Sequence, residues 1–131
     1  MIDFPLSNIL AIDTQHQGIL ETVAALRDLE NDNYTTVGVL NQFGNLVNKI
    51  RSHFAVEESI MLKAEYFDYL DHCAAHTSFL DLVEKMLAEA EKDITTAFHS
   101  FALIERTIKD HIAVEAILFK SSIHPISLTR Q

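Results

Sequence analysis

The chain has 131 residues, of which 48% are hydrophobic, and its formal net charge is −9 with only ten Lys and Arg residues. This acidic balance argues against a nucleic-acid-binding protein, because contact with phosphates requires clustered Lys and Arg side chains. Cys73 is the only cysteine, which excludes an intrachain disulfide and fits a reducing compartment. The sequence shows neither a signal peptide nor an apolar run long enough to span a membrane, so we expect a cytoplasmic protein without a membrane partner.

Helical patterns dominate the chain. Three glycines and two prolines are few for a chain of this length, which favours long helices over many tight turns. Apolar residues recur at the spacing of a helix face in four segments, and we predict helices at about 13–30, 35–63, 69–90 and 94–120. Short connections between them predict a single all-α domain over residues 1–131, an antiparallel up-down-up-down four-helix bundle.

The ends of the chain follow less regular patterns. Residues 1–12 are apolar without helical spacing, and we expect an irregular leader that packs on the bundle. Asp13 or Thr14 is the expected N-cap of the first helix, because short polar side chains accept hydrogen bonds from free backbone N–H groups there. The tail after Lys120 contains Pro125 and is expected to be irregular.

Side chains that can bind metal recur on the apolar faces of these helices. His53 and Glu57, like His111 and Glu115, are four residues apart, so each pair lies one turn apart on one helix face. The complete set is His16, His53, Glu57, His72, His76, His111 and Glu115. Buried imidazoles and carboxylates are costly unless they have partners, and five histidines with two carboxylates exceed what a single ion needs. The set therefore predicts two metal ions that share the carboxylates in the core of the bundle.

Taken singly, these residues have simpler explanations. A histidine such as His16, taken alone, is more often a satisfied or surface histidine than a metal ligand, and each His–Glu pair is compatible with an ordinary ion pair along a helix. The metal hypothesis rests on their coincidence on four successive helices. His99 and His124 lack this support, and we expect both at the surface. Ligating histidines usually donate their second N–H to a carboxylate or carbonyl, and Glu58, Asp71 and Asp110 adjoin the predicted ligands and are candidates for this role. A solvated helix face is the favoured interpretation of each.

Four stretches together resemble the hemerythrin family, and in particular the single-domain bacteriohemerythrins. They are "IDTQHQGIL", "HFAVEESIM", "YFDYLDHCAAH" and "KDHIAVE", in the family's order and at about its spacings. The resemblance implies a non-haem diiron centre, with an oxo or hydroxo bridge, that binds O2 reversibly. It assigns His72, His76 and His111 to one iron, His16 and His53 to the other, and Glu57 to a bridge between them. O2 would bind at the iron with two histidines, which keeps an open position.

The second carboxylate departs from the family's pattern. The family usually has an Asp five residues after the histidine of the fourth helix, where this chain has Ala116, and Glu115 comes one residue earlier. Position i+5 lies about 140° round the helix from the histidine and position i+4 only about 40°. We predict that Glu115 replaces the Asp as second bridge. The alternatives are that Glu115 only hydrogen-bonds a ligand or solvent, or that the site is incomplete with one labile metal.

The predicted O2 pocket departs as well. The family often has a Trp four residues before the histidine of the fourth helix, where this chain has Thr107. Phe54, Ile108 and Ile112 are the predicted apolar wall, which would keep water and protons from bound O2 and which would also serve as core. A more open pocket would speed autoxidation.

The function predicted from these features is an O2 carrier, store or sensor rather than an enzyme. The alternatives are a diiron redox enzyme acting on peroxide, NO or O2, and an iron store or sensor. A metal-free helical interaction module is also conceivable, but buried histidines argue against it.

Overall fold

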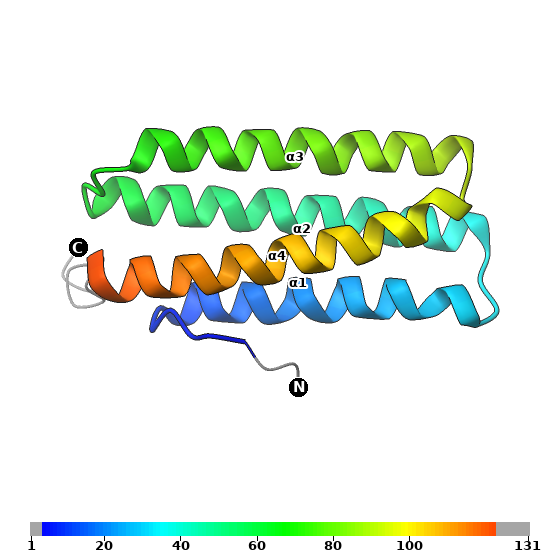
Figure 1. Cartoon of the computed structure of the whole chain (residues 1–131), viewed down its shortest axis with the longest axis horizontal. Coiled ribbons are helices and arrows are strands. Elements are labelled where there is room, and N and C mark those ends of the chain that lie inside the picture. Colours follow the sequence, from blue (N-terminus) through cyan, green and yellow to red (C-terminus); the bar gives the residue numbers. More distant parts are fainter. Residues whose placement is uncertain (1–3, 123–131) are drawn as a thin grey trace.

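The structure, a computed structural model, describes residues 4–122, with side chains described as far as Lys120. Four long helices form the molecule: α1 (Leu10–Asp28), α2 (Thr36–Lys63), α3 (Tyr69–Lys92) and α4 (Thr95–Ser122), with a short 3-10 helix η1 (Leu29–Asn31) after α1. Successive helices run antiparallel, and each packs against two neighbours around a square (Figure 1). The predicted all-α four-helix bundle is confirmed, and the part of the chain that is described contains no strand.

The first helix begins three residues earlier than the sequence predicted. Its N-cap is Ile9, which makes no side-chain capping hydrogen bond, so the expectation that Asp13 or Thr14 caps the helix is wrong. Asp13 lies inside the first turn, where its Oδ1 accepts hydrogen bonds from the backbone N–H of Ser7 at 2.8 Å and from the Ser7 hydroxyl at 2.9 Å. This carboxylate fastens the leader to α1 instead of starting the helix.

The described part of the leader packs on the bundle, as predicted. Ile9 is buried, and Phe4 packs against the main core with its ring edge-on to that of His16, the centroids 6.2 Å apart. The tail with His124 lies outside the described residues.

The apolar core is divided into two clusters. The larger contains Phe43, Phe101 and Ile104 and fills most of the bundle. The smaller contains Ile12, Met61 and Phe119, with Tyr66 from the connection between α2 and α3. On α1, α2 and α4, the predicted metal ligands fall in the chain between residues of the larger cluster and residues of the smaller one. The ligands thus form a polar layer between two apolar cores.

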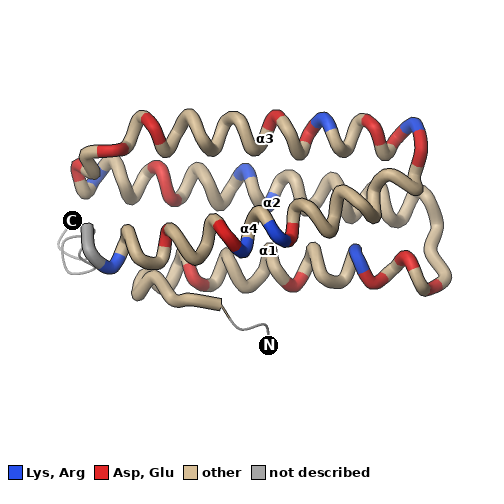
Figure 2. Tube along the Cα trace, viewed as in Figure 1, with Lys and Arg blue, Asp and Glu red and all other residues tan. Residues whose placement is uncertain are grey.

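Charged residues are spread along the bundle. Figure 2 shows acidic residues along the bundle and the few Lys and Arg residues scattered among them. Among the described residues, no helix combines the length and the apolar character needed to cross a membrane.

Candidate metal centre

All four helices supply an imidazole to the polar layer, and two of them also supply a carboxylate. His16 comes from α1, His76 from α3, and the pairs His53–Glu57 and His111–Glu115 come from α2 and α4. His16, His53, His76, Glu57 and Glu115 are at most 2% exposed. The His111 side chain is 26% exposed, so the layer reaches the surface along α4.

Glu57 lies between two pairs of imidazoles. Its Oε2 is 3.1 Å from Nε2 of His53 and 3.6 Å from Nε2 of His16. Its Oε1 is 3.3 Å from Nε2 of His76 and 4.0 Å from Nε2 of His111. Each oxygen of this carboxylate therefore faces a different pair of histidines, which is the arrangement that a bridging carboxylate requires.

Glu115 occupies the same centre from the opposite side of the bundle. Its Oε1 is 3.0 Å from Nε2 of His111 and 3.6 Å from Nε2 of His16, while its Oε2 is 3.8 Å from Nε2 of His76. The side chain is fully buried among these imidazoles and does not reach solvent. This carboxylate, too, lies close to histidines of both pairs. Unlike in Glu57, one of its oxygens, Oε1, faces a histidine of each pair, His111 and His16.

The nitrogen and oxygen atoms of this layer that could bind metal lack hydrogen-bond partners within the described protein. The Nε2 atoms of His16, His53, His76 and His111 are buried without one, as are both oxygens of Glu57 and of Glu115. They form two groups, His16–His53–Glu57–Glu115 and Glu57–His76–His111–Glu115, in each of which the ligand atoms lie within 4.8 Å of one another. Unpaired buried polar atoms are costly, and two metal ions would satisfy all eight, so the residues fit a pair of ions that share both carboxylates.

The electrostatics of the layer favour charged side chains. Burial alone lowers the pKa of His16, but the carboxylates of Glu115 and Glu57 outweigh it and raise that pKa to about 9. Burial also lowers the pKa of His76, which Glu115, Glu57 and Glu58 raise to about 10. Conversely, burial favours the neutral form of Glu57, yet the imidazoles of His16, His53 and His76 hold its pKa well below the usual value. The pKa of Glu115 is likewise lowered against its burial, chiefly by His111 and His16.

Comparison with known families places this chain. Residues 7–120 match the family described as the hemerythrin HHE cation binding domain. The chain belongs to the hemerythrin family. No curated protein and no solved structure matches it. The buried His/Glu layer fits the metal-binding site that the description of the family implies.

Two side chains outside the layer contact histidines of the layer. The Nδ1 of His76 is 2.7 Å from Oε2 of Glu58, and the Nδ1 of His53 is 2.8 Å from Oε1 of Gln15. The expectation that Glu58 belongs to a solvated face is wrong, because the side chain turns along α2 toward α3 and stays only 29% exposed. Asp71 and Asp110 are exposed, as expected.

Sequence reasoning missed Gln15. Its position directly before His16 gives a signal that it lies near the site, but not which histidine it contacts. That histidine belongs to α2, and the contact depends on how α1 and α2 are rotated against each other.

His72 does not join the two groups of ligand atoms. It is half-buried, and its ring centroid lies 6.1 Å from that of His76 and 5.4 Å from that of Tyr66. The four other histidines and both glutamates are brought together, whereas the role of His72 as a ligand stays a prediction. His99 is exposed, as predicted.

Of the predicted pocket residues, Phe54 packs directly against the histidines of the layer. Phe54, Ile108 and Ile112 are buried, and the ring of Phe54 stacks on that of His76 with centroids 3.8 Å apart. Thr107 is half-buried, and its hydroxyl donates to the carbonyl of Leu103 on the same helix.

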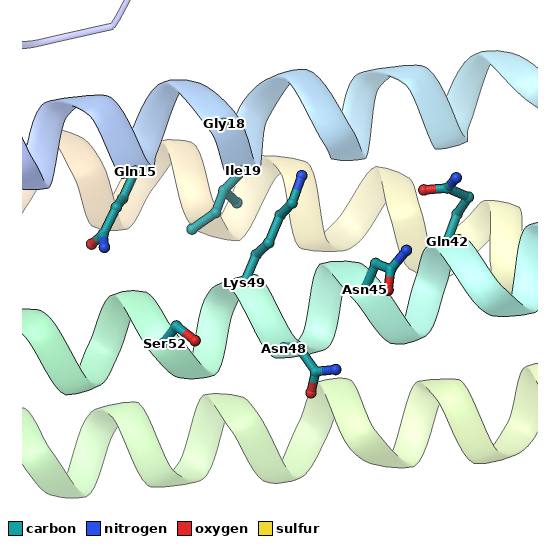
Figure 3. Close-up of a pocket in the computed structure, with 8 residues that line it drawn as sticks. All are labelled: Gln15, Gly18, Ile19, Gln42, Asn45, Asn48, Lys49 and Ser52. Carbon is teal, nitrogen blue, oxygen red and sulfur yellow. The ribbon is translucent and has the colours of Figure 1, made fainter.

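A cavity lies elsewhere, along the face between α1 and α2. It has a volume of about 500 Å³, and polar side chains line it, among them Gln15, Asn45, Lys49 and Ser52 (Figure 3). An adjoining cavity of about 460 Å³ continues along the same face past Thr22. Neither cavity is lined by the predicted O2-pocket residues, so that pocket stays a prediction.

Proposed function

We propose that this chain is a diiron protein that binds O2 reversibly, as a carrier, store or sensor. One observation carries the proposal: eight buried donor atoms without hydrogen-bond partners lie in two groups that share both carboxylates. Imidazole suits iron, and carboxylates suit a pair of ions held close together in a bundle core.

The residues have separate tasks in this proposal. His16 and His53 would hold one iron, His76 and His111 the other, with His72 assigned to the second iron by the family resemblance. Glu57 and Glu115 would contact both ions. The bound pair would supply the electrons that reversible O2 binding needs.

The apolar neighbours of the histidines would protect that chemistry. Phe54 packs against His53, His76 and His111, with ring centroids 6.0, 3.8 and 5.6 Å away. Ile108 and Ile112 are buried beside it on α4. These side chains would keep water and protons away from the inner side of the layer, and so would protect a bound reduced metal from oxidation.

Metal analysis with optical spectroscopy tests the proposal. We expect about two irons per chain and a visible charge-transfer band that forms in air and disappears under argon. Zinc in place of iron, or an absence of metal, would contradict it. Irreversible bleaching in air, or turnover with peroxide or NO, would replace the O2-binding function with that of a redox enzyme.

A substitution of Glu115 tests its predicted role as second bridge. Glu115→Ala should reduce the iron content by about half or more, because both ions lose a shared ligand. Glu105→Ala is the matched control, since Glu105 is a buried glutamate of the same helix that pairs with Arg27 and not with the layer. If Glu115→Ala keeps as much iron as the control, Glu115 is not a bridge.

A further inference from the structure

Among the ligand atoms that the structure brings together, the two predicted metal positions have the same donor types, while His72, which the family resemblance assigns to the second position, lies outside both groups. Each group of ligand atoms has two imidazoles, and both groups use the same two carboxylates. The likeness follows from the sequence, because "HFAVE" on α2 and "HIAVE" on α4 place a His and a Glu at equal spacing.

The outer contacts of the two groups differ in charge. His76 contacts a carboxylate through its Nδ1, that of Glu58, at 2.7 Å. His53 contacts a neutral amide oxygen, that of Gln15, at 2.8 Å. The Nδ1 of His16 is buried and has no hydrogen-bond partner in the protein. One group therefore has an anionic outer partner, whereas the outer partner of the other is neutral.

The charge of the outer partner affects how well an imidazole binds metal. In both contacts the oxygen accepts a hydrogen bond from Nδ1–H, so Nε2 is the nitrogen that faces the layer and that would bind metal after losing its own proton. A carboxylate acceptor draws that proton more strongly than an amide does, and so makes Nε2 a stronger donor to the metal. His76 is then a better ligand than His53, although the two are equally buried.

We propose that Glu58 and Gln15 tune the two metal positions unequally, in addition to what His72 contributes: Glu58 strengthens the hold on the ion between His76 and His111, and the neutral Gln15 leaves the ion between His16 and His53 labile. This inference rests on the proposed function, because it needs two ions in the layer. It names two positioning residues that act through the histidines and not on the metal directly.

Release of iron to a chelator tests the inference. The protein is loaded with Fe(II) without oxygen, mixed with excess ferrous chelator, and followed by the absorbance of the chelate. We expect two phases, each of one ion per chain. Glu58→Gln should speed the slow phase about tenfold or more and leave the fast phase unchanged. Gln15→Glu should slow the fast phase, a gain that mere structural damage does not produce.

Asp110→Asn is the matched control for charge. Asp110 is exposed, adjoins His111 in the chain, and loses the same single charge without a contact to an imidazole. Two ions that leave in phases unaffected by Glu58→Gln and Gln15→Glu would overturn this inference alone, as would an Asp110→Asn effect equal to that of Glu58→Gln. A chain that takes up no metal would overturn the proposed function and this inference with it.

Discussion

The two His-x-x-x-Glu pairs lie on helices α2 and α4, which bring them together in the centre of the bundle. Helices α2 and α4 are not neighbours around the square, so the two pairs meet across the core. His53 lies 3.1 Å from its own Glu57, and His111 lies 3.0 Å from its own Glu115. The unusual position of Glu115 thus copies the geometry of Glu57 and still reaches the centre, one residue before the buried Ala116.

The raised pKa values of the histidines predict how pH affects the metal-free protein. The pKa of His16 is raised from 6.5 to about 9 and that of His76 to about 10, so their contribution to stability is complete below pH 6.5. It is lost as pH rises through the two folded-state values, because the imidazoles then lose the protons that pair with Glu57 and Glu115. We expect a loss on the order of a few kcal/mol, counted once for the coupled cluster.

Thermal unfolding followed by circular dichroism measures this effect. The metal-stripped protein should lose stability between pH 7 and pH 10, and the metal-loaded protein should not, because imidazoles that bind metal carry no proton on the ligand nitrogen. On the acid side, the lowered pKa of Glu57 gives stability that is present above pH 4.5 and lost as pH falls further. A metal-stripped protein with a flat profile from pH 7 to pH 10 would contradict the assigned charges.

Single residues were predicted well where helical spacing alone places them. His16, His53, Glu57, His76, His111 and Glu115 all share inward faces, and the structure brings them together. The contacts of Glu58 and Gln15 were not predicted, because each joins two helices whose relative rotation the spacing does not define. His72 has the right spacing, yet its ring stays beside Tyr66, away from the ligand atoms.

At the scale of the elements, the four helices were predictable because their apolar faces repeat without interruption over many turns. The start of α1 was not predictable, because an Asp near the start of a helix can either cap the helix or bind another segment. An Asp near a helix start indicates a cap, but Asp13 uses its carboxylate to hold Ser7 of the leader. Local sequence does not distinguish these two hydrogen bonds.

Replacing the two glycines of α2 by alanine should change the stability of the protein in opposite directions. A Cβ at Gly44 would meet nothing within 4 Å, so Gly44→Ala should stabilise the protein by about 0.5–1 kcal/mol through higher helix propensity. A Cβ at Gly38 would lie 2.8 Å from the hydroxyl oxygen of Thr35. That oxygen caps α2 by accepting from the backbone N–H of Gly38, so Gly38→Ala should destabilise the protein.

Chemical denaturation of the two variants and the original protein checks this prediction. The midpoints should move in opposite directions while the slopes stay equal. Stabilisation by both substitutions would show that helix propensity outweighs the cap of Thr35.

At the scale of the whole molecule, the chain inserts a polar layer between two apolar clusters. The layer is fully enclosed on the sides of α1, α2 and α3 and partly open at His111. In the metal-free protein, the two carboxylates are balanced by the two imidazoles with raised pKa, His16 and His76. Metal ions would replace those protons, so that metal binding would exchange one set of positive charges in the layer for another.

The sequence predicted this general plan through the bundle topology and the inward histidines, but not the division of the core. The two clusters are separated because the ligands of three helices fall at one level, and that level depends on how the helices are shifted along one another. Spacing within each helix does not define such shifts.

The central claim is that the layer holds two metal ions through shared carboxylates. Anaerobic titration of the metal-stripped protein with Fe(II), followed by calorimetry, tests this claim most directly. The account predicts saturation at about two ions per chain, with protons released as His16 and His76 give up their charge. Saturation at one ion per chain, or an absence of binding heat, would contradict it.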